Sequence, residues 1–516
     1  QYGSTGLLNA ATGSGSVSTF HIGELSGTVY AEHFYENPSN SYNNDSDFKA
    51  AGIQSSASST GTATLTIDNL SGIVAVNSFD SKVTDGKSKA YGLTASTSVN
   101  AAISGIVFAG SCKNGDLLRL LEKIQQGTAA ADTVTGNATG YAIVGGKGDD
   151  VITLNAEAKV FGMIALNSGN DILNIAAQAE IFGSVDGDIL TLTNNGVISG
   201  DVSGQTLTIS GTGSISGAVY GGAILGTGAL ELDTVSITVS GNTVAGGIYA
   251  GAYAVAGSAA HVKNAFITVN GTDNIIHASG SGANSTTDNV TITIGNTFGG
   301  KILADDGQAA VVTLKSGSQF NGTMQFDAND TLVVELGAVL GNSIDLNGGK
   351  LKIVVPASGV RLRAAVANLA DILTMISGAG SLEFQGTAVI DGSDLTDAEK
   401  IQLETNLSSV IRISAAAGST VVFDADATVK LAGLTEITGE GTVKLVVPPA
   451  NDLTVADSAT LKIGDGLSVT NGAVQVTDGK LTVSANDGGS VTITELPEGI
   501  DSIEIASGTK GEIVVD

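Results

Sequence analysis

The chain repeats itself, and this repetition limits its fold more than any other feature of the sequence. The segment FHIGELSGTVYAEHF (Phe20–Phe34) aligns without gaps with LTIDNLSGIVAVNSF (Leu65–Phe79). The Leu-Ser-Gly at its centre recurs as Ile-Ser-Gly at Ile103 and again at Ile215. Internal similarity at a spacing of about 20–50 residues is typical of architectures in which equivalent units stack on one another.

Further repeats follow along the chain. VSITVSGNTVAGGIYAG, FITVNGTDNIIHASG and VTITIGNTFGGKILADDG place these residues at equivalent positions: Ile237, Ile267 and Ile292, then Ile248, Ile276 and Ile302. A third group comprises DVITL, DILNI, DILTL and QTLTI, which begin at Asp150, Asp171, Asp188 and Gln205. Near the end of the sequence, DATVKL from Asp426 recurs as SATLKI from Ser458.

Each repeat combines a short alternating strand with a turn rich in Gly, Asn and Asp. Alternation places every second side chain on one face of a strand, so stacked strands can fill a narrow core with Val, Ile and Leu. Such a core has little room for rings, which agrees with an aromatic content of 4%. We therefore expect a mainly β fold, a β-solenoid (parallel β-helix-like) of right-handed or irregular form, with short helical insertions and a β-rich C-terminal part.

Three segments interrupt this pattern with helical periodicity. Gly115–Gly127 and Arg361–Ile376 carry apolar residues at helical spacing, and in TDAEKIQLETNL the residues Thr396 and Glu399 predict a capping box. The expected regions are an irregular β-repeat region with a short helix (1–140), the β-solenoid (141–345), a helix-containing insertion (346–415) and a C-terminal β-repeat region (416–516).

Charge and composition exclude several classes of protein. With 23 basic and 51 acidic residues the net charge is −28. This charge disfavours nucleic acid as a partner, because the sequence has no cluster of basic residues that could bind the phosphates. No apolar run is long enough for a transmembrane segment, and the lone Cys112 leaves no intrachain disulfide. Since the sequence starts at Gln1, we expect a mature or trimmed form from which a secretion signal has been removed.

GGKGDDVIT resembles the nonapeptide of RTX-type calcium-binding parallel β-rolls, at Gly145, Gly146, Gly148, Asp150 and Ile152. A second copy keeps Gly169, Asp171 and Leu173 but has Leu166 and Asn167 in place of the first two glycines. The resemblance implies calcium as a cofactor, with Asp150 and Asp171 as ligands and Asp149 and Asp188 as additions. The alternative is ordinary turn chemistry, in which Asp and Asn accept hydrogen bonds from the backbone.

SGAVYGG and GGIYAGAYAVAG resemble passenger regions of bacterial autotransporters, and the acidic, Cys-poor, Thr/Val/Ala/Gly-rich profile is similar to that of S-layer proteins. These resemblances imply an extracellular place on the bacterial cell surface. We expect a non-enzymatic structural protein that self-assembles into a layer, sheath or filament, with copies of itself and cell-envelope or host glycans as partners. The alternatives are an autotransporter-type adhesin and a polysaccharide-active β-helix enzyme.

Two groups of ring-bearing residues have open roles. The histidines His21, His33, His261 and His277 show no zinc-binding spacing and read as scattered structural positions. Tyr220, Tyr249 and Tyr253 either form an exposed ladder for a glycan or partner, or stack at the corners of the repeats. No GxSxG, P-loop or Ser/His/Asp signature is present.

Overall fold

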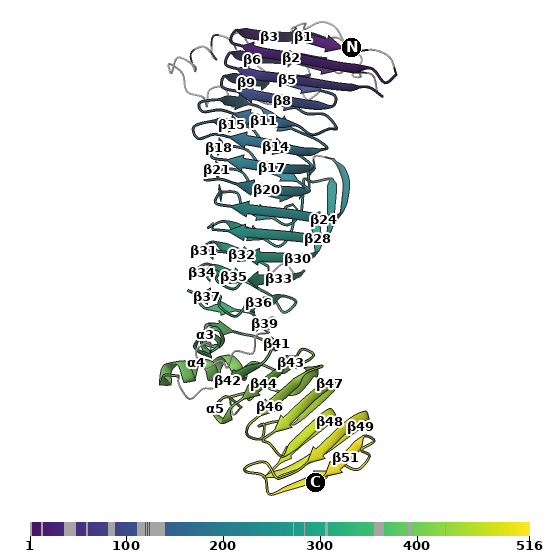
Figure 1. Ribbon diagram of the computed structural model, residues 1–516, viewed down its shortest axis with the longest axis vertical. Helices are drawn as coiled ribbons and strands as arrows, with labels where there is room; N and C mark the ends of the chain where they lie inside the picture. Colours follow the sequence, from purple (N-terminus) through teal and green to yellow (C-terminus); the bar gives the residue numbers. More distant parts are fainter. Residues whose placement is uncertain are drawn as a thin grey trace. The chain divides into compact units, whose positions relative to one another are not determined.

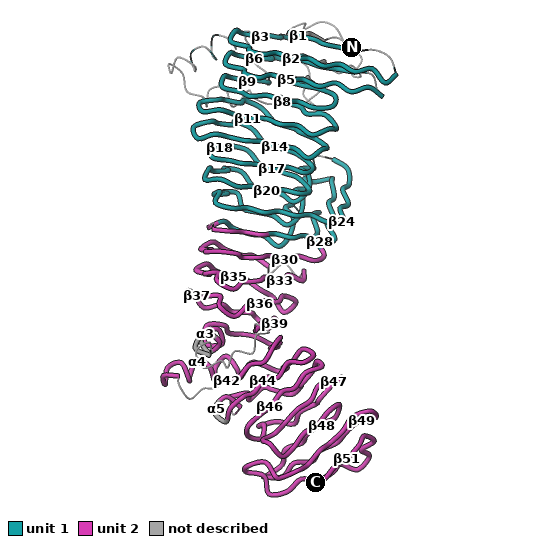
Figure 2. The backbone as a smooth tube through the Cα atoms, viewed as in Figure 1, with its two compact units in different colours: residues 1–267, 274–287 teal, residues 268–273, 288–516 magenta. Residues whose placement is uncertain are grey.

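The computed structural model describes residues 3–11, 14–35, 48–57, 60–80, 88–110, 119, 121, 123, 140–225, 227–271, 273–282, 284–304, 308–355, 366–390, 395–428 and 430–516. Strands make up 59% and helices 5%, so the prediction of a mainly β chain is confirmed. The chain divides into two compact units, residues 1–267 with 274–287 and residues 268–273 with 288–516 (Figure 2). The four regions expected from the sequence have other boundaries than these two units and stay a prediction.

In the first unit the chain passes in turn through three parallel sheets, named here sheets A, B and C; one passage is called a round (Figure 1). Sheet A contains, in order, β1 (Gly3–Ala10), β4 (Phe48–Ser56), β7 (Ser88–Ala95), β10 (Tyr141–Val144), β13 (Met163–Ala165), β16 (Val185–Asp186), β19 (Val202–Gly204), β22 (Val219–Gly221), β26 (Ile248–Tyr249) and β29 (Ile275–His277). Sheet B contains β2 (Val17–Leu25), β5 (Thr62–Leu70), β8 (Ser98–Ile103), β11 (Val151–Leu154), β14 (Asn170–Ile175), β17 (Ile189–Asn194), β20 (Thr206–Ser210) and β24 (Gly228–Ser240). Sheet C contains β3 (Thr28–Tyr35), β6 (Ile73–Asp80), β9 (Ile106–Gly110), β12 (Lys159–Phe161), β15 (Glu180–Phe182), β18 (Val197–Ile198), β21 (Ser214–Ile215) and β25 (Thr243–Val244).

The first repeat found in the sequence is reproduced residue by residue in this pairing. Phe20 lies opposite Leu65 in sheet B, and Thr28 lies opposite Ile73 in sheet C. The Ser-Gly turn between these sheets stacks so closely that a Cβ on Gly72 would lie 1.9 Å from the carbonyl oxygen of Gly27. Only glycine allows that approach, which explains the recurrence of the motif.

Inward and outward residues alternate along each strand, and the core lies between the three sheets. In β5 the inward Leu65 and Ile67 are buried, whereas Thr64 and Thr66 on the other face are partly exposed. Sheet C adds a column of rings, because Phe161 lies opposite both Phe108 and Phe182 and stacks on Phe182 with ring centres 4.6 Å apart. Aliphatic and aromatic columns of this kind bury apolar surface from round to round.

Three sequence alignments prove wrong in detail. Ile215 lies in sheet C beside Ile198, so its Ile-Ser-Gly is not equivalent to that of Ile103, which ends a strand of sheet B. DILTL is displaced by two residues, because Asp171 pairs with Leu190 rather than with Asp188. DATVKL begins inside a helix, α5 (Ala425–Thr428), and the segment that pairs with SATLKI is TVKL at 442–445.

The second unit also consists mainly of parallel strands. Its longest series pairs β30 (Ser285–Ile294), β33 (Ala309–Leu314), β36 (Thr331–Glu335), β39 (Lys350–Val354), β41 (Ser381–Gln385), β43 (Arg412–Ala415), β45 (Glu436–Gly439) and β47 (Leu453–Ile463). Shorter series are β42 (Ala388–Ile390), β44 (Thr420–Phe423) and β46 (Thr442–Leu445); β31 (Thr297–Phe298), β34 (Gln319–Phe320) and β37 (Val339–Leu340); β32 (Lys301–Leu303) and β35 (Thr323–Gln325); and β38 (Ile344–Asp345) and β40 (Ile376–Ser377). At its end, β47, β48 (Leu467–Thr477) and β49 (Lys480–Ile493) are antiparallel, and β49 pairs in parallel with β50 (Ser502–Ile505) and β51 (Glu512–Val515).

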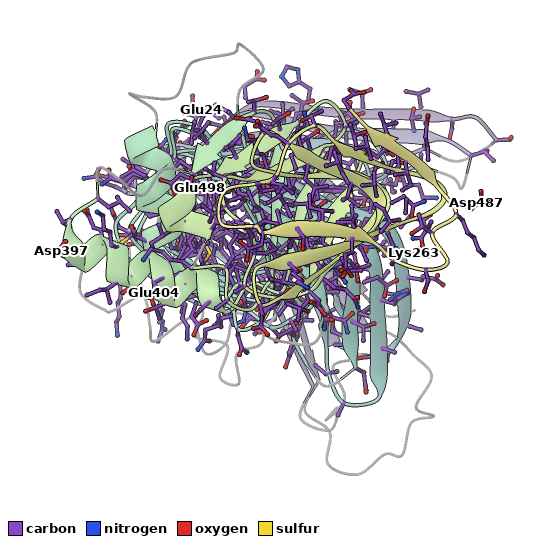
Figure 3. The ribbon with its side chains drawn as sticks, turned by 90° about the horizontal axis from the view of Figure 1, so that it is seen from below. Glu24, Lys263, Asp397, Glu404, Asp487 and Glu498 are labelled. Carbon is purple, nitrogen blue, oxygen red and sulfur yellow. The ribbon has the colours of Figure 1, made fainter. Side chains whose placement is uncertain are left out.

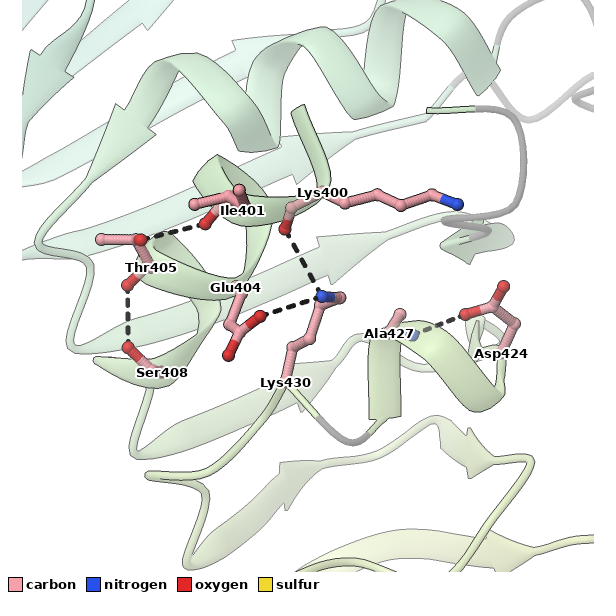
Figure 4. Close-up of polar contacts among 8 residues, drawn as sticks. All are labelled: Lys400, Ile401, Glu404, Thr405, Ser408, Asp424, Ala427 and Lys430. Atoms are coloured by element: carbon pink, nitrogen blue, oxygen red, sulfur yellow. Dashed lines mark hydrogen bonds and ion pairs between the residues drawn. The ribbon is translucent and has the colours of Figure 1, made fainter. Parts of the chain in front are cut away.

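Two of the predicted helices are present in this unit, as α3 (Val366–Met375) and α4 (Asp397–Ser408). The capping box is confirmed: the Glu399 N–H donates to Thr396 Oγ1 at 3.3 Å, and the Thr396 N–H donates to Glu399 Oε2 at 2.8 Å. Beyond the short α5, Lys430 Nζ reaches back to Glu404 Oε2 at 3.3 Å and to the Lys400 carbonyl at 3.4 Å (Figure 4). These contacts tie α4 to the strands that follow it.

The predicted helix at 115–127 lies outside the described residues except for Arg119, Leu121 and Lys123, which are helical, with Leu121 buried. Among the described helices, none is long and apolar enough to cross a membrane. Charged side chains lie at the surface: Lys263 of β28 (Ser258–Asn270), labelled in Figure 3, pairs with Asp233 of β24 at 2.6 Å.

Candidate metal site

Two aspartates interrupt an otherwise apolar column of sheet B. One inward residue from each of six successive rounds stacks there: Leu65, Val99, Asp150, Asp171, Leu190 and Leu207. Asp150 has no exposed surface and Asp171 has 1%. Two carboxyl groups therefore stand in adjacent rounds at positions where the neighbouring rounds carry aliphatic side chains.

One oxygen of each carboxyl group has a clear structural role. Asp150 Oδ1 accepts a hydrogen bond from the Val99 N–H, and Asp171 Oδ1 accepts one from the Asp150 N–H at 3.0 Å. Each aspartate thus binds the backbone of the round before it. This is the turn chemistry that the sequence offered as the alternative to metal binding.

The second oxygen of each group has no such role. Asp150 Oδ2 and Asp171 Oδ2 are both buried without a hydrogen bond of normal geometry. The Gly146 backbone N–H nevertheless faces the Asp150 carboxyl group and lowers its pKa, so the oxygen of Asp171 is the less compensated of the two. Asp150 Oδ2 lies against Gly145, where an added Cβ would come within 1.9 Å of it and within 2.9 Å of the Leu166 carbonyl oxygen. Because buried polar atoms normally find partners, these two oxygens are the feature of the site that needs explanation.

The electrostatics of the pair follow from burial. Burial raises the pKa of Asp150 to about 7, and the neighbouring negative charge of Asp171 adds to this. Burial likewise raises the pKa of Asp171 to about 6, with further contributions from Asp149 and Asp188. The ionised pair is costly in this environment unless a proton or a cation compensates its charge.

The other two predicted ligands lie elsewhere. Asp149 is exposed, and its Oδ1 accepts a hydrogen bond from the Asn170 N–H at 2.8 Å. Asp188 is also exposed and borders a surface groove, which is lined by residues that include Asn167, Asp186, Gln205, Leu230 and Leu232. The structure therefore brings Asp150 and Asp171 together in the core and keeps Asp149 and Asp188 outside it.

The donor set available to a metal is small. No group of three or more His, Cys, Asp or Glu side chains that could hold a metal is found among the described residues. The carboxyl groups of Asp150 and Asp171, with the Leu166 carbonyl beside Gly145, are hard oxygen donors of the kind that calcium prefers. Asp150 Oδ2 fills the place that a Cβ on Gly145 would take, and Asp171 Oδ2 lies near Gly187 instead. The two oxygens are the donors that an ion between these rounds would use, and calcium would require further oxygens from water or backbone.

An equivalent aspartate in the second unit escaped the sequence analysis. Asp330 precedes TLVVE as Asp150 precedes VITL, and its side chain is 1% exposed. Asp330 Oδ1 accepts from the Ala310 N–H at 2.9 Å, and Oδ2 accepts from the Asp327 N–H at 2.7 Å. An Asp directly before an apolar alternating strand is the signal that links these positions.

The ring-bearing residues lie mainly in stacks or ion pairs. Tyr220, Tyr249 and His277 occupy successive strands of sheet A, with centres 5.1 Å apart for the tyrosine pair and 4.1 Å for Tyr249 and His277. Tyr253 stacks on Tyr220 at 5.6 Å. His21 pairs with Asp68, His261 lies on β28, and the side chain of His33 and all of Cys112 lie outside the described residues.

The rings in this stack face one another, which is the arrangement that stacking at the corners of the repeats predicts. Searches of protein families, of curated proteins and of solved structures find no match to this chain.

Proposed function

We propose that the chain is a β-solenoid that serves as a non-enzymatic structural protein of a bacterial cell surface and assembles with copies of itself into an extracellular layer, sheath or filament. The observation that supports this proposal is the A–B–C order kept from β1 to β22, in which each strand pairs in parallel with the strand of the round before. A fold built by adding rounds presents the same edge at every step, and such edges favour association unless they are covered.

Calcium is the cofactor that we propose for this fold. Asp150 and Asp171 would hold it through the two buried oxygens that lack hydrogen-bond partners. A bound divalent cation would neutralise the two carboxylates and thereby join two successive rounds. The net charge of −28 supports the same idea, because divalent cations also reduce repulsion between acidic copies.

Negative-stain microscopy of the purified chain, with calcium and with a chelator, tests this proposal. Ordered sheets or filaments that dissolve in the chelator are the expected result. Assemblies that persist in the chelator would keep the structural role and remove calcium from it. Dispersed single particles in both conditions, with light scattering at the mass of one chain, would contradict the assembly role.

A further inference from the structure

The surface groove beside Asp188, named here the Asp188 groove, lies where the chain passes from sheet A to sheet B. Its volume is about 160 Å³, which is room for one long side chain or a molecule of that size. Three glycines from successive rounds line it, Gly187, Gly204 and Gly222. Because glycine has no side chain, a ligand can approach the main chain closely at these positions.

The first half of β24 supplies the apolar part of the groove. β24 has 13 residues, but only its residues 236–239 pair with β20. The residues before them extend beyond sheet B (Figure 1), and among them the half-buried Leu230 and Leu232 line the groove. Gln205 Nε2 donates to the Thr234 carbonyl at 2.9 Å and ties this half of the strand to the corner. The leucine carbons suit the methylene groups of a ligand.

Two carboxyl groups line the same groove. Asp186 is half-buried and Asp188 is exposed. Burial raises the pKa of Asp186, the hydrogen bond that Ser203 Oγ donates to Asp186 Oδ1 at 2.5 Å opposes this, and the charge of Asp188 adds to it. The two carboxylates are therefore close enough to repel each other.

A third carboxyl group faces the lining of the groove from the core. Asp171 Oδ2 is buried, has no hydrogen bond of normal geometry, and lies 3.6 Å from the place that a Cβ on Gly187 would take. The charge of Asp188 also raises the pKa of Asp171. Among the described residues, no Lys, Arg or His lines the groove or shifts the pKa of Asp171 or Asp186. The groove therefore attracts a positive charge that these residues do not supply.

We infer that the Asp188 groove binds a primary alkylammonium group. Asp186 and Asp188 hold its charge, and its methylene chain packs along Leu230 and Leu232. A free amine and a lysine side chain of another protein share this chemistry. Such binding requires neither the assembly role nor calcium.

An organic cation fits this groove better than a metal ion does. A metal would use the carboxyl groups but gain nothing from the leucines, and the part of the chain that the structure describes holds no group of three or more His, Cys, Asp or Glu side chains suited to a metal. An ammonium group has three donors and no acceptor. Two carboxylates and one amide oxygen, from Asn167 or Gln205 of the lining, are enough to accept them.

The test is a ligand-observed NMR titration of butylammonium into the chain at pH 8 in a chelator, for wild type, Asp188→Asn and Asp149→Asn. Asp149 is the matched control, because it is exposed and acts on Asp171 through its charge as Asp188 does, but does not line the groove. We expect Asp188→Asn to raise the dissociation constant about 10-fold. Asp149→Asn should leave it within error of wild type.

Methylammonium tests the leucines without a variant. It carries the same charge with three fewer carbons, and its dissociation constant should be about 10-fold higher than that of butylammonium. Equal affinity for the two amines, equal weakening by the two variants, or no saturable binding by wild type would each overturn the inference and leave the proposed function standing.

A third probe, N-acetyl-lysine methylamide, separates the two sources of the ammonium group. Binding as tight as that of butylammonium would support the inference with a lysine side chain as the ligand. Binding of butylammonium alone would support it with a free amine as the ligand, because the backbone of the peptide would then be excluded from the groove.

Discussion

Asp330 in the second unit occupies the same kind of position as Asp150 and Asp171 in the first unit, but the hydrogen bonding of its carboxyl group differs. All three are buried inward aspartates near the start of a strand, and all three accept a hydrogen bond from the strand of the round before. Asp330 uses its second oxygen to accept the Asp327 N–H, whereas Asp150 and Asp171 leave theirs without a partner.

This difference separates two reasons for burying a carboxyl group. At Asp330 the backbone satisfies the charge, so the residue is explained by structure alone. At Asp171 a backbone N–H binds one of the two oxygens, and at Asp150 the Val99 N–H binds one oxygen while the Gly146 N–H faces the carboxyl group. The two groups lie in adjacent rounds where their charges repel. The pair Asp150 and Asp171 therefore needs an additional partner, a proton or a cation, whereas Asp330 does not.

Asp330→Ala should give the largest effect. The substitution removes the acceptor of two N–H groups, that of the buried Ala310 and that of the half-buried Asp327, and we expect a loss of about 3 kcal/mol in the free energy of unfolding. Hydrogen exchange of the amides of β33 measures this loss locally. Unchanged exchange in β33 would show that Asp330 does not hold the two rounds together.

The pH dependence should separate the two units. Folding raises the pKa of Asp150 and Asp171 from 3.8 to about 7 and about 6, so the folded state keeps protons that the unfolded chain has lost. This contribution is complete below pH 4 and disappears as the pH rises through 6 and 7. In a chelator, the first unit should lose on the order of 2 kcal/mol between pH 5 and pH 8.

The second unit provides the comparison for that experiment. The pKa of Glu335 and that of Glu383 are lowered, against the effect of burial, by Lys315 and by Lys352 respectively. Their contribution to stability is present above their ordinary pKa and is lost only as the pH falls below it. The hydrogen-exchange protection factors of β36 and β41, which are corrected for the intrinsic effect of pH on amide exchange, should therefore stay constant between pH 5 and pH 8 while those of β11 and β14 fall.

The double substitution Asp150→Asn and Asp171→Asn should come next in size. Each new side chain keeps an oxygen for the backbone N–H that the aspartate bound, at Val99 and at position 150. Because the substitution also removes the repulsion, we expect a gain of about 1 kcal/mol in a chelator at pH 8. Thermal melts should show this gain together with a flat pH response. Asp330→Asn is the matched control and should destabilise, because the amide NH₂ then faces a backbone N–H.

Asp188→Asn should have the smallest effect. Asp188 is exposed and acts on the pair only through its charge, which raises the pKa of Asp171. We expect thermal stability within error of wild type and a pH midpoint of the first unit moved slightly toward acid. A loss of calcium response in this variant would instead identify Asp188 as a ligand.

Much of the fold could be predicted from the sequence, because aligning the repeats shows which residues of successive rounds lie opposite each other. The gapless match around Leu-Ser-Gly predicts that Phe20 stacks on Leu65, and the structure has this pairing. The glycine of that motif is required by a close backbone contact, so Gly27, Gly72 and Gly105 mark the same corner in the first three rounds. Thr396 and Glu399 predicted the start of α4 in the same way, through paired local hydrogen bonds.

The errors arose where short patterns recur at places that differ in three dimensions. The turn that follows Gly187 reaches Leu190 in three residues, whereas the turn from Leu166 reaches Asp171 in five, so Asp188 falls outside the column that DILTL suggested. The letters TVKL occur both at 428–431 within DATVKL and at 442–445. The copy at 442–445 is the strand that pairs with its neighbours. Asp330 was missed because no glycine motif precedes it.

Calorimetric titration of calcium into the chain at pH 7.5 tests the account most directly, with wild type beside the variant that carries both Asp150→Asn and Asp171→Asn. The account predicts a saturable site in wild type that releases protons on binding and is absent from the variant. No binding by wild type, or equal binding by the variant, would contradict it and reduce both aspartates to the structural role of Asp330.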